Sequence, residues 1–130
     1  MTIREVIVAD SDGRAVYSQR FGTHPTDRQS IAYSSLVSAV HSFGKMLSPH
    51  DVNEIKLGEI CLLIHSANEL LFAIVVDDDR RESNEEKLKS IADLFLEHYY
   101  REISPSQPAL SENSANDFTG VLVQHNYVGT

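Results

Sequence analysis

Basic residues are scarce in this sequence, and cysteine is almost absent. Lysine and arginine together number 11 against 19 aspartate and glutamate residues, which gives a formal net charge of −8. Proteins that bind nucleic acids normally carry basic side chains that replace the counterions of the phosphates, so this balance argues against nucleic acid as a direct partner. The single cysteine, Cys61, excludes an internal disulfide and is typical of a reducing compartment.

Long apolar segments are missing too. No apolar run reaches the roughly 20 residues that a membrane-spanning helix needs. Residues 1–5 do not place a basic region before a long apolar one, as a signal peptide would. We therefore expect a cytoplasmic protein. Its 130 residues, of which 42% are hydrophobic, suffice for one domain with a core of its own.

The first half of the sequence predicts a hairpin followed by a helix. Two apolar segments, 3–9 and 15–21, flank the turn-forming residues 10–13, which predicts two antiparallel strands. Thr26, with Gln29 three residues further on, fits a helix-capping box. Apolar residues then recur at helical spacing, so a helix is predicted after the hairpin.

The second half predicts three more strands and a second helix. Strands over 52–57, 59–65 and 70–77 have connections too short for helical crossovers, so they must run antiparallel. The last two strands are apolar at successive positions, which requires both faces of the sheet to be covered. A helix is predicted over 83–103, with Ser83 as the first residue of a capping box.

These elements predict an α+β fold with a five-stranded antiparallel sheet, in the order β-β-α-β-β-β-α-α, and with helices on both faces. The helix after the hairpin would cover one face, and the second helix with the tail would cover the other. Residues 1–103 form the predicted domain and 104–117 a polar linker. Residues 118–130 fit a third helix, although Gly120 and the nearby valines also allow a strand.

Three stretches together resemble a longin domain, the profilin-like module of membrane-trafficking proteins: the hairpin VIVADSDGRAVYSQRF, the meander IKLGEICLLIHSANELLFAIVVDDD and the helix EEKLKSIADLFLEHYY. The chain is also similar to the small adaptin and TRAPP subunits. The roadblock domain, which is related to longin, normally has a helix before its first strand, whereas the first element predicted here is a strand, so the chain resembles longin more.

The resemblance implies a non-enzymatic module that forms homo- or heterodimers and binds a small GTPase, a trafficking protein or another longin or roadblock domain. Such partners can bring the protein to a membrane surface. The contact surfaces common in the family are the first helix and the neighbouring third strand. In this sequence the corresponding positions include Ile31, His41, Ile55 and Leu57.

Asp10 and Asp12 are the residues that suggest the main enzymatic alternative, a phosphatase. They follow an apolar strand, as in the nucleophile motif of haloacid-dehalogenase-type phosphatases, where one Asp attacks phosphorus and the next protonates the leaving group beside Mg²⁺. That fold needs a parallel sheet with crossovers, for which residues 52–77 leave no room. The same loop fits calcium poorly, because Phe21 stands where a calcium loop needs its last acid. We therefore expect both aspartates to form a turn.

No cofactor or metal is expected from the remaining candidates. Cys61 and His65 share a strand face, but two ligands are too few for a metal site. The glycines are isolated, so no phosphate-binding loop is present. A further alternative is a PAS- or profilin-like sensor of a small molecule. Such a sensor would need a polar group in its core, for which His65 and Tyr33 are the candidates.

Overall fold

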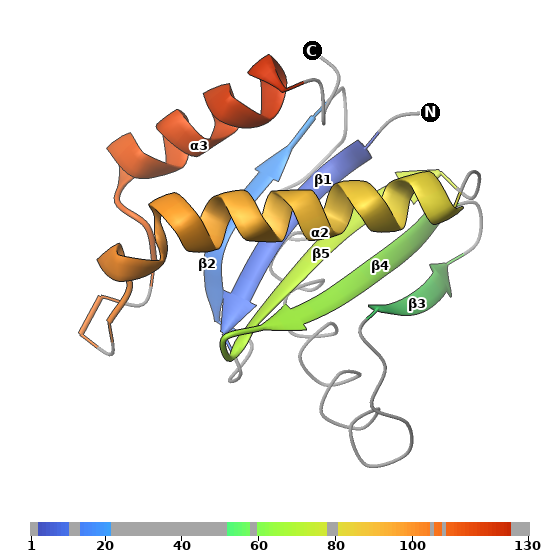
Figure 1. Cartoon of the computed structure of the whole chain (residues 1–130), viewed down its shortest axis with the longest axis horizontal. Helices are drawn as coiled ribbons and strands as arrows, with labels where there is room; N and C mark the ends of the chain where they lie inside the picture. The colour runs from blue at the N-terminus through green and yellow to red at the C-terminus, as the bar shows by residue number, and fades with distance from the viewer. Residues whose placement is uncertain are drawn as a thin grey trace.

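The fold consists of an antiparallel sheet with two long helices on one of its faces (Figure 1). The computed structural model describes residues 3–10, 14–21, 52–57, 60–77, 81–104, 106–107 and 109–125. Its elements are β1 (Ile3–Asp10), β2 (Ala15–Arg20), β3 (Val52–Leu57), β4 (Ile60–Ala67), β5 (Leu70–Asp77), α2 (Arg81–His98), the 3-10 helix η1 (Tyr100–Glu102) and α3 (Glu112–Gln124).

The five strands lie in the order β2-β1-β5-β4-β3, and every neighbouring pair is antiparallel. The predicted hairpin is β1 with β2, and the predicted meander is β3, β4 and β5. Pairing of β1 with β5 joins the two units, so β1, β5 and β4 form the interior of the sheet and β2 and β3 its edges. The α+β class and the antiparallel arrangement are thereby confirmed.

The turn between β4 and β5 is tighter than its sequence indicates. Ala67 pairs with Leu70, so only Asn68 and Glu69 lie between the strands. Both have positive φ, of 51° and 65°, which matches the twist of paired strands in a two-residue turn. We expected the turn to span residues 66–69, but β4 continues to Ala67 because the left-handed pair reverses the chain within two residues.

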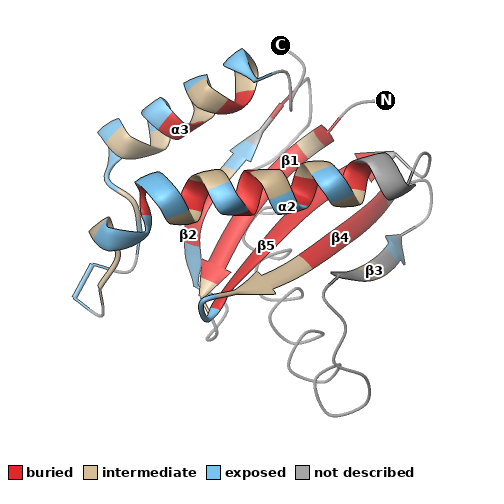
Figure 2. Cartoon of the chain, in the orientation of Figure 1, coloured by how far each residue is buried: buried red, intermediate tan, exposed pale blue. Residues whose placement is uncertain are grey.

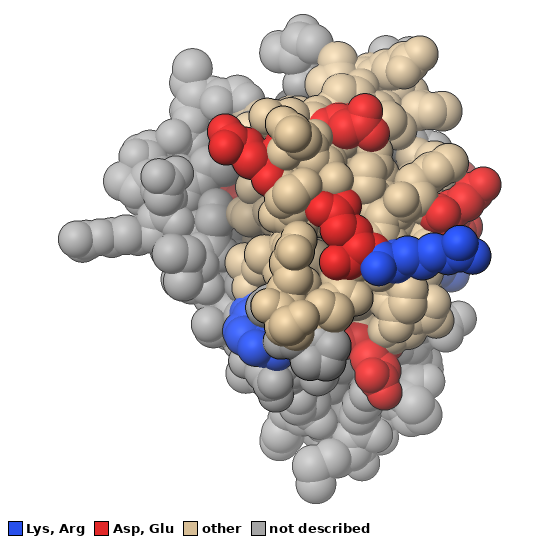
Figure 3. All heavy atoms as spheres, turned by 90° about the vertical axis from the view of Figure 1, so that its left-hand side faces the viewer, with Lys and Arg blue, Asp and Glu red and all other residues tan. Residues whose placement is uncertain are grey.

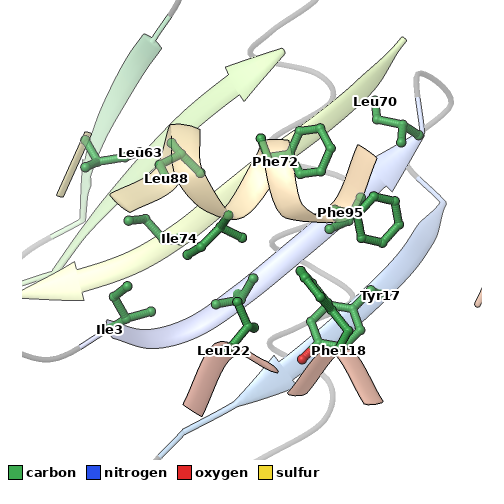
Figure 4. Packing of buried hydrophobic residues seen from close by; sticks show 14 of the residues in the cluster. Ile3, Tyr17, Leu63, Leu70, Phe72, Ile74, Leu88, Phe95, Phe118 and Leu122 are labelled. Atoms are coloured by element: carbon green, nitrogen blue, oxygen red, sulfur yellow. The ribbon is translucent and has the colours of Figure 1, made fainter. Parts of the chain in front are cut away.

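The first face of the sheet carries the main core, together with α2 and α3 (Figure 2). Side chains such as Leu63, Phe72 and Ile74 lie under the apolar stripe of α2 (Figure 4). The rings of Phe72 and Phe95 meet edge to face with their centroids 5.6 Å apart. Both described helices therefore bury their apolar sides against one face of the sheet.

The second face is buried as well. Six apolar side chains form it, none of them more than 3% exposed: Ile7, Leu62, Ile64, Leu71, Ala73 and Val75. Among the described residues no helix packs on this face. The helix predicted after the hairpin lies outside the described residues. Burial on both faces confirms the inference drawn from the apolar pattern of β4 and β5.

Two helix starts differ from the predicted ones. Helix α2 begins at Arg81, so Ser83 lies in its first turn and is not the capping residue. Helix α3 begins at Glu112, inside the segment predicted as a linker, because the Ser111 hydroxyl accepts a hydrogen bond from Ser114 N at 3.2 Å. The ambiguous tail thus contains a helix, and Gly120 lies within it with nothing within 4 Å of an added Cβ.

Candidate interaction surface

Asp10, at the end of β1, stabilises the hairpin through hydrogen bonds. Its Oδ1 accepts a hydrogen bond from Arg14 N at 2.9 Å, and its Oδ2 accepts one from Arg14 Nε at 2.7 Å. Asp10 N in turn donates to Arg14 O at 3.0 Å, which closes the hairpin. Asp12 lies outside the described residues. Both carboxylate oxygens of Asp10 thus bind Arg14 across the turn. The sheet is antiparallel, whereas the phosphatase alternative requires a parallel one.

The two candidate ligands on β4, Cys61 and His65, differ in their surroundings. Cys61 is buried in the core and its thiol donates to the carbonyl of Leu62 at 3.8 Å. His65 is half-buried and lies near the end of β4, not in the core that the sensor alternative requires. Tyr33 lies outside the described residues. In the part of the chain that the structure describes, no group of three or more His, Cys, Asp or Glu residues could hold a metal ion.

The predicted contact residues are only partly placed. Ile31 and His41 lie outside the described residues. Ile55 and Leu57 belong to β3, where they pair with Leu62 and Ile60 of β4. The structure therefore places two of the four predicted contact residues on an edge strand of the sheet.

The two edges of the sheet differ. At the β2 edge, Leu110 N donates to Val16 O at 3.0 Å, so the segment before α3 occupies part of the outer backbone of β2. Strand β3 pairs with β4 on one side, and no described residue pairs with its other side. Two charged residues, half-buried Glu54 and exposed Lys56, lie on β3. Within the described chain, β3 is thus the end of the sheet at which no further strand is placed.

Two tyrosines anchor α3 to the domain, and the sequence patterns did not reveal them. The Tyr99 hydroxyl donates to Asp117 Oδ2. Thr119 donates its hydroxyl proton to Ala115 O at 3.0 Å, so Tyr17 donates to Thr119 Oγ1 across 2.6 Å. Burial raises the pKa of Tyr17 to about 12. Burial and the bond to Asp117 also raise the pKa of Tyr99, so both hydroxyls stay protonated at neutral pH.

The start of α3 is held from the preceding 3-10 helix. Ser111 N donates to Glu102 Oε1 at 3.1 Å. Hydrogen bonds from Ser114 and Ser111 lower the pKa of the Glu102 carboxyl, so it stays ionised at the N-terminus of α3. Figure 3 shows this side of the molecule, where acidic side chains lie scattered among uncharged ones and the described residues form no basic patch. No helix in the described chain is long and apolar enough to span a bilayer.

Solved structures share this arrangement. A Roadblock/LC7 domain from Streptomyces avermitilis superposes with a TM-score of 0.64 at 8% sequence identity, covering 75% of this chain and 86% of that one. MglB from Myxococcus xanthus superposes with a TM-score of 0.51 at 12% sequence identity, covering 73% of this chain and 85% of that one. No protein-family model and no curated protein matches the sequence.

The protein has a roadblock-like fold. The predicted resemblance to the longin and roadblock group is thereby confirmed for the fold. The sequence favoured longin over roadblock because its first element is a strand, and the solved structures similar to it include a Roadblock/LC7 domain and MglB. At these identities the likeness concerns the arrangement of strands and helices alone.

Proposed function

We propose that this roadblock-like protein is a non-enzymatic interaction module that dimerises and binds a small GTPase or another trafficking or signalling protein. The observation that carries the proposal is the difference between the two sheet edges. The β2 edge is partly occupied by the backbone at Leu110, whereas β3 has a backbone edge that no described residue pairs with. Further strands add to a sheet at its outer strands, so the β3 strands of two copies are suited to pair.

The burial of the second face is evidence for the proposed partner surface. The side chains of this face are fully buried although both described helices pack on the first face. We propose that the helix predicted after the hairpin, with Ile31 and His41, covers this face and completes a five-stranded, two-sided domain. Its outer side and the neighbouring strand β3, with Ile55 and Leu57, then form one continuous docking surface.

The remaining features fit a role without catalysis. Asp10 is used by the hairpin, and Cys61 is buried in the core. The proposal makes residues 1–103 the interaction domain, with α3 packed on it, and makes the protein cytoplasmic. Association with membranes would then arise through the partner.

Two proline variants test the dimer. Successive backbone N–H groups of a strand point to opposite sides. Of Asn53→Pro and Glu54→Pro, one therefore removes an N–H that points away from β4, and the other removes one that points towards β4. We expect the outward variant to keep the wild-type stability but to become monomeric in sedimentation equilibrium. Two well-folded variants that both remain dimers would refute edge pairing.

A binding assay tests the partner class. The immobilised wild-type protein is offered a panel of purified small GTPases, each loaded in turn with GDP and with a non-hydrolysable GTP analogue. We expect at least one to bind with a preference for one nucleotide state, because switch segments differ between the two states. A strictly monomeric protein that binds none of them would overturn the proposed function.

A further inference from the structure

Strand β3, at the end of the sheet, carries one acidic and one basic side chain on the same face (Figure 1). Glu54 pairs with Leu63 of β4, which belongs to the core of the first face. Lys56 pairs with Cys61, which belongs to the same core. Residues directly opposite each other on paired strands point to the same face. Any strand that pairs with β3 therefore meets a negative and a positive position on the first face.

Two copies of one strand can pair about a twofold axis in few registers. When the axis is perpendicular to the sheet, the strands run antiparallel and each face continues from one copy to the next. Opposite residues then share a face, so the axis passes through a residue of β3. An axis at Ile55 sets residues 53–57 against 57–53 of the second copy, and an axis at Glu54 sets 52–56 against 56–52. An axis at any other residue of β3 pairs three positions or fewer.

The charges distinguish these two long registers. With the axis at Glu54, this carboxylate lies opposite the Glu54 carboxylate of the second copy, and like charges directly opposite each other destabilise paired strands. With the axis at Ile55, Glu54 lies opposite Lys56 of the second copy, and symmetry repeats the pair on the other side of the axis. Opposite charges in this position stabilise paired strands. The register with Ile55 on the axis therefore replaces one repulsion by two attractions.

We propose that β3 recognises the β3 of a second copy in the register with Ile55 on the twofold axis, and that Glu54 and Lys56 make this pairing selective for the same chain. The inference rests on the proposed function, because it assigns the partner and the register of the same strand. Both side chains also interact with groups of their own chain. Mixtures of variant chains separate the two roles, because mixing leaves the interactions within each chain unchanged.

Charge reversal tests the selectivity. Glu54→Lys makes both positions basic and Lys56→Glu makes both acidic, so each variant alone places like charges opposite each other on both sides of the axis. We expect each to dimerise about tenfold more weakly than the wild type in sedimentation equilibrium at low salt. An equimolar mixture of the two should form a heterodimer with nearly wild-type affinity. The double variant Glu54→Lys, Lys56→Glu should again pair with itself, because it exchanges the two charges.

The contradicting results differ for this inference and for the proposed function. If Glu54 and Lys56 act within their own chain alone, the mixture stays as weak as either variant, and the inference is overturned. If both single variants dimerise like the wild type, the strands pair in another register. The inference then fails while pairing of β3 remains. A monomeric wild-type chain would overturn both.

Cysteine cross-linking measures the register without charge, and it decides the question if charge reversal changes the circular dichroism of the fold. Directly opposite residues of antiparallel strands have Cα atoms about 4.5–5.5 Å apart, within reach of a disulfide, whereas diagonal neighbours lie about 7–8 Å apart. Under mild oxidation, a mixture of Glu54→Cys and Lys56→Cys chains should therefore form the mixed dimer in preference to either self-linked one. The wild type controls for the native Cys61, which is buried. Predominant self-linking of Glu54→Cys would place the axis at that residue and overturn the inference.

Discussion

Leu62 and Leu63 are neighbours on β4 whose side chains belong to opposite faces of the sheet. Leu63 belongs to the first-face core and Leu62 to the second face, and each is at most 1% exposed. Truncation of a fully buried leucine to alanine costs about 2–5 kcal/mol, because burial is lost and a cavity is left. We therefore expect Leu62→Ala and Leu63→Ala to lower the free energy of unfolding by similar amounts within this range.

Urea denaturation followed by circular dichroism measures both losses. Leu62→Met keeps the volume, so it should cost less than about 1.5 kcal/mol and shows whether the site tolerates a different side chain. An exposed leucine would behave otherwise, since surface substitutions usually change stability by about 0.5 kcal/mol or less. A large loss for Leu63→Ala with a loss below about 0.5 kcal/mol for Leu62→Ala would refute the burial of the second face.

Three further predictions concern α3 and its contacts. Gly120→Ala should stabilise the protein by about 1 kcal/mol in urea denaturation, since a Cβ meets nothing there and alanine favours the helix. Ser111→Ala should destabilise it by about 1 kcal/mol through loss of the cap, whereas Ser111→Asp should keep most of the stability. The folded-state pKa of Tyr17 lies above its ordinary value, so its contribution is complete below pH 10 and is lost as the pH rises from 10 to about 12. Tyr17→Phe should flatten this part of the profile of stability against pH.

Each of these has a distinct contradicting result. A loss of stability in Gly120→Ala would mean that the helix is not continuous through this position. An unchanged stability in Ser111→Ala would remove the reason for the start of α3. Because the pKa of Tyr99 is raised as well, Tyr17→Phe should leave the part of the loss that is due to Tyr99. If Tyr17→Phe keeps the full loss of stability above pH 10, the Tyr17 hydroxyl does not contribute to it.

The strands could be predicted because their signal is local. Alternate side chains of a strand point to opposite faces, so the apolar residues of β4 and β5 already require burial on both sides. Short connections then leave antiparallel pairing as the arrangement available. The predicted strand bounds differ from the observed ones by at most two residues. The largest difference is at the end of β4, where the left-handed conformations of Asn68 and Glu69 shorten the turn.

The helix starts could not be predicted equally well, because capping patterns recur within helices. Ser83 and Glu86 have the spacing of a capping box but lie inside α2, whereas Ser111 caps α3 without a glutamate three residues later. The contacts between α3 and the rest of the domain could not be predicted for a different reason. Tyr17 and Thr119 are 102 residues apart, and only the tertiary fold brings them together.

The central functional claim is that the β3 edge pairs with a second copy. Hydrogen–deuterium exchange of the β3 amides, measured at two protein concentrations on either side of the dimer dissociation constant, tests it most directly. The account predicts that the outward-pointing amides of Val52–Leu57 are protected at the high concentration and exchange rapidly at the low one, while the inner amides of β4 and β5 stay protected at both. Equal exchange of the β3 amides at both concentrations, with sedimentation still reporting twice the 14.5 kDa mass of the chain, would contradict the claim.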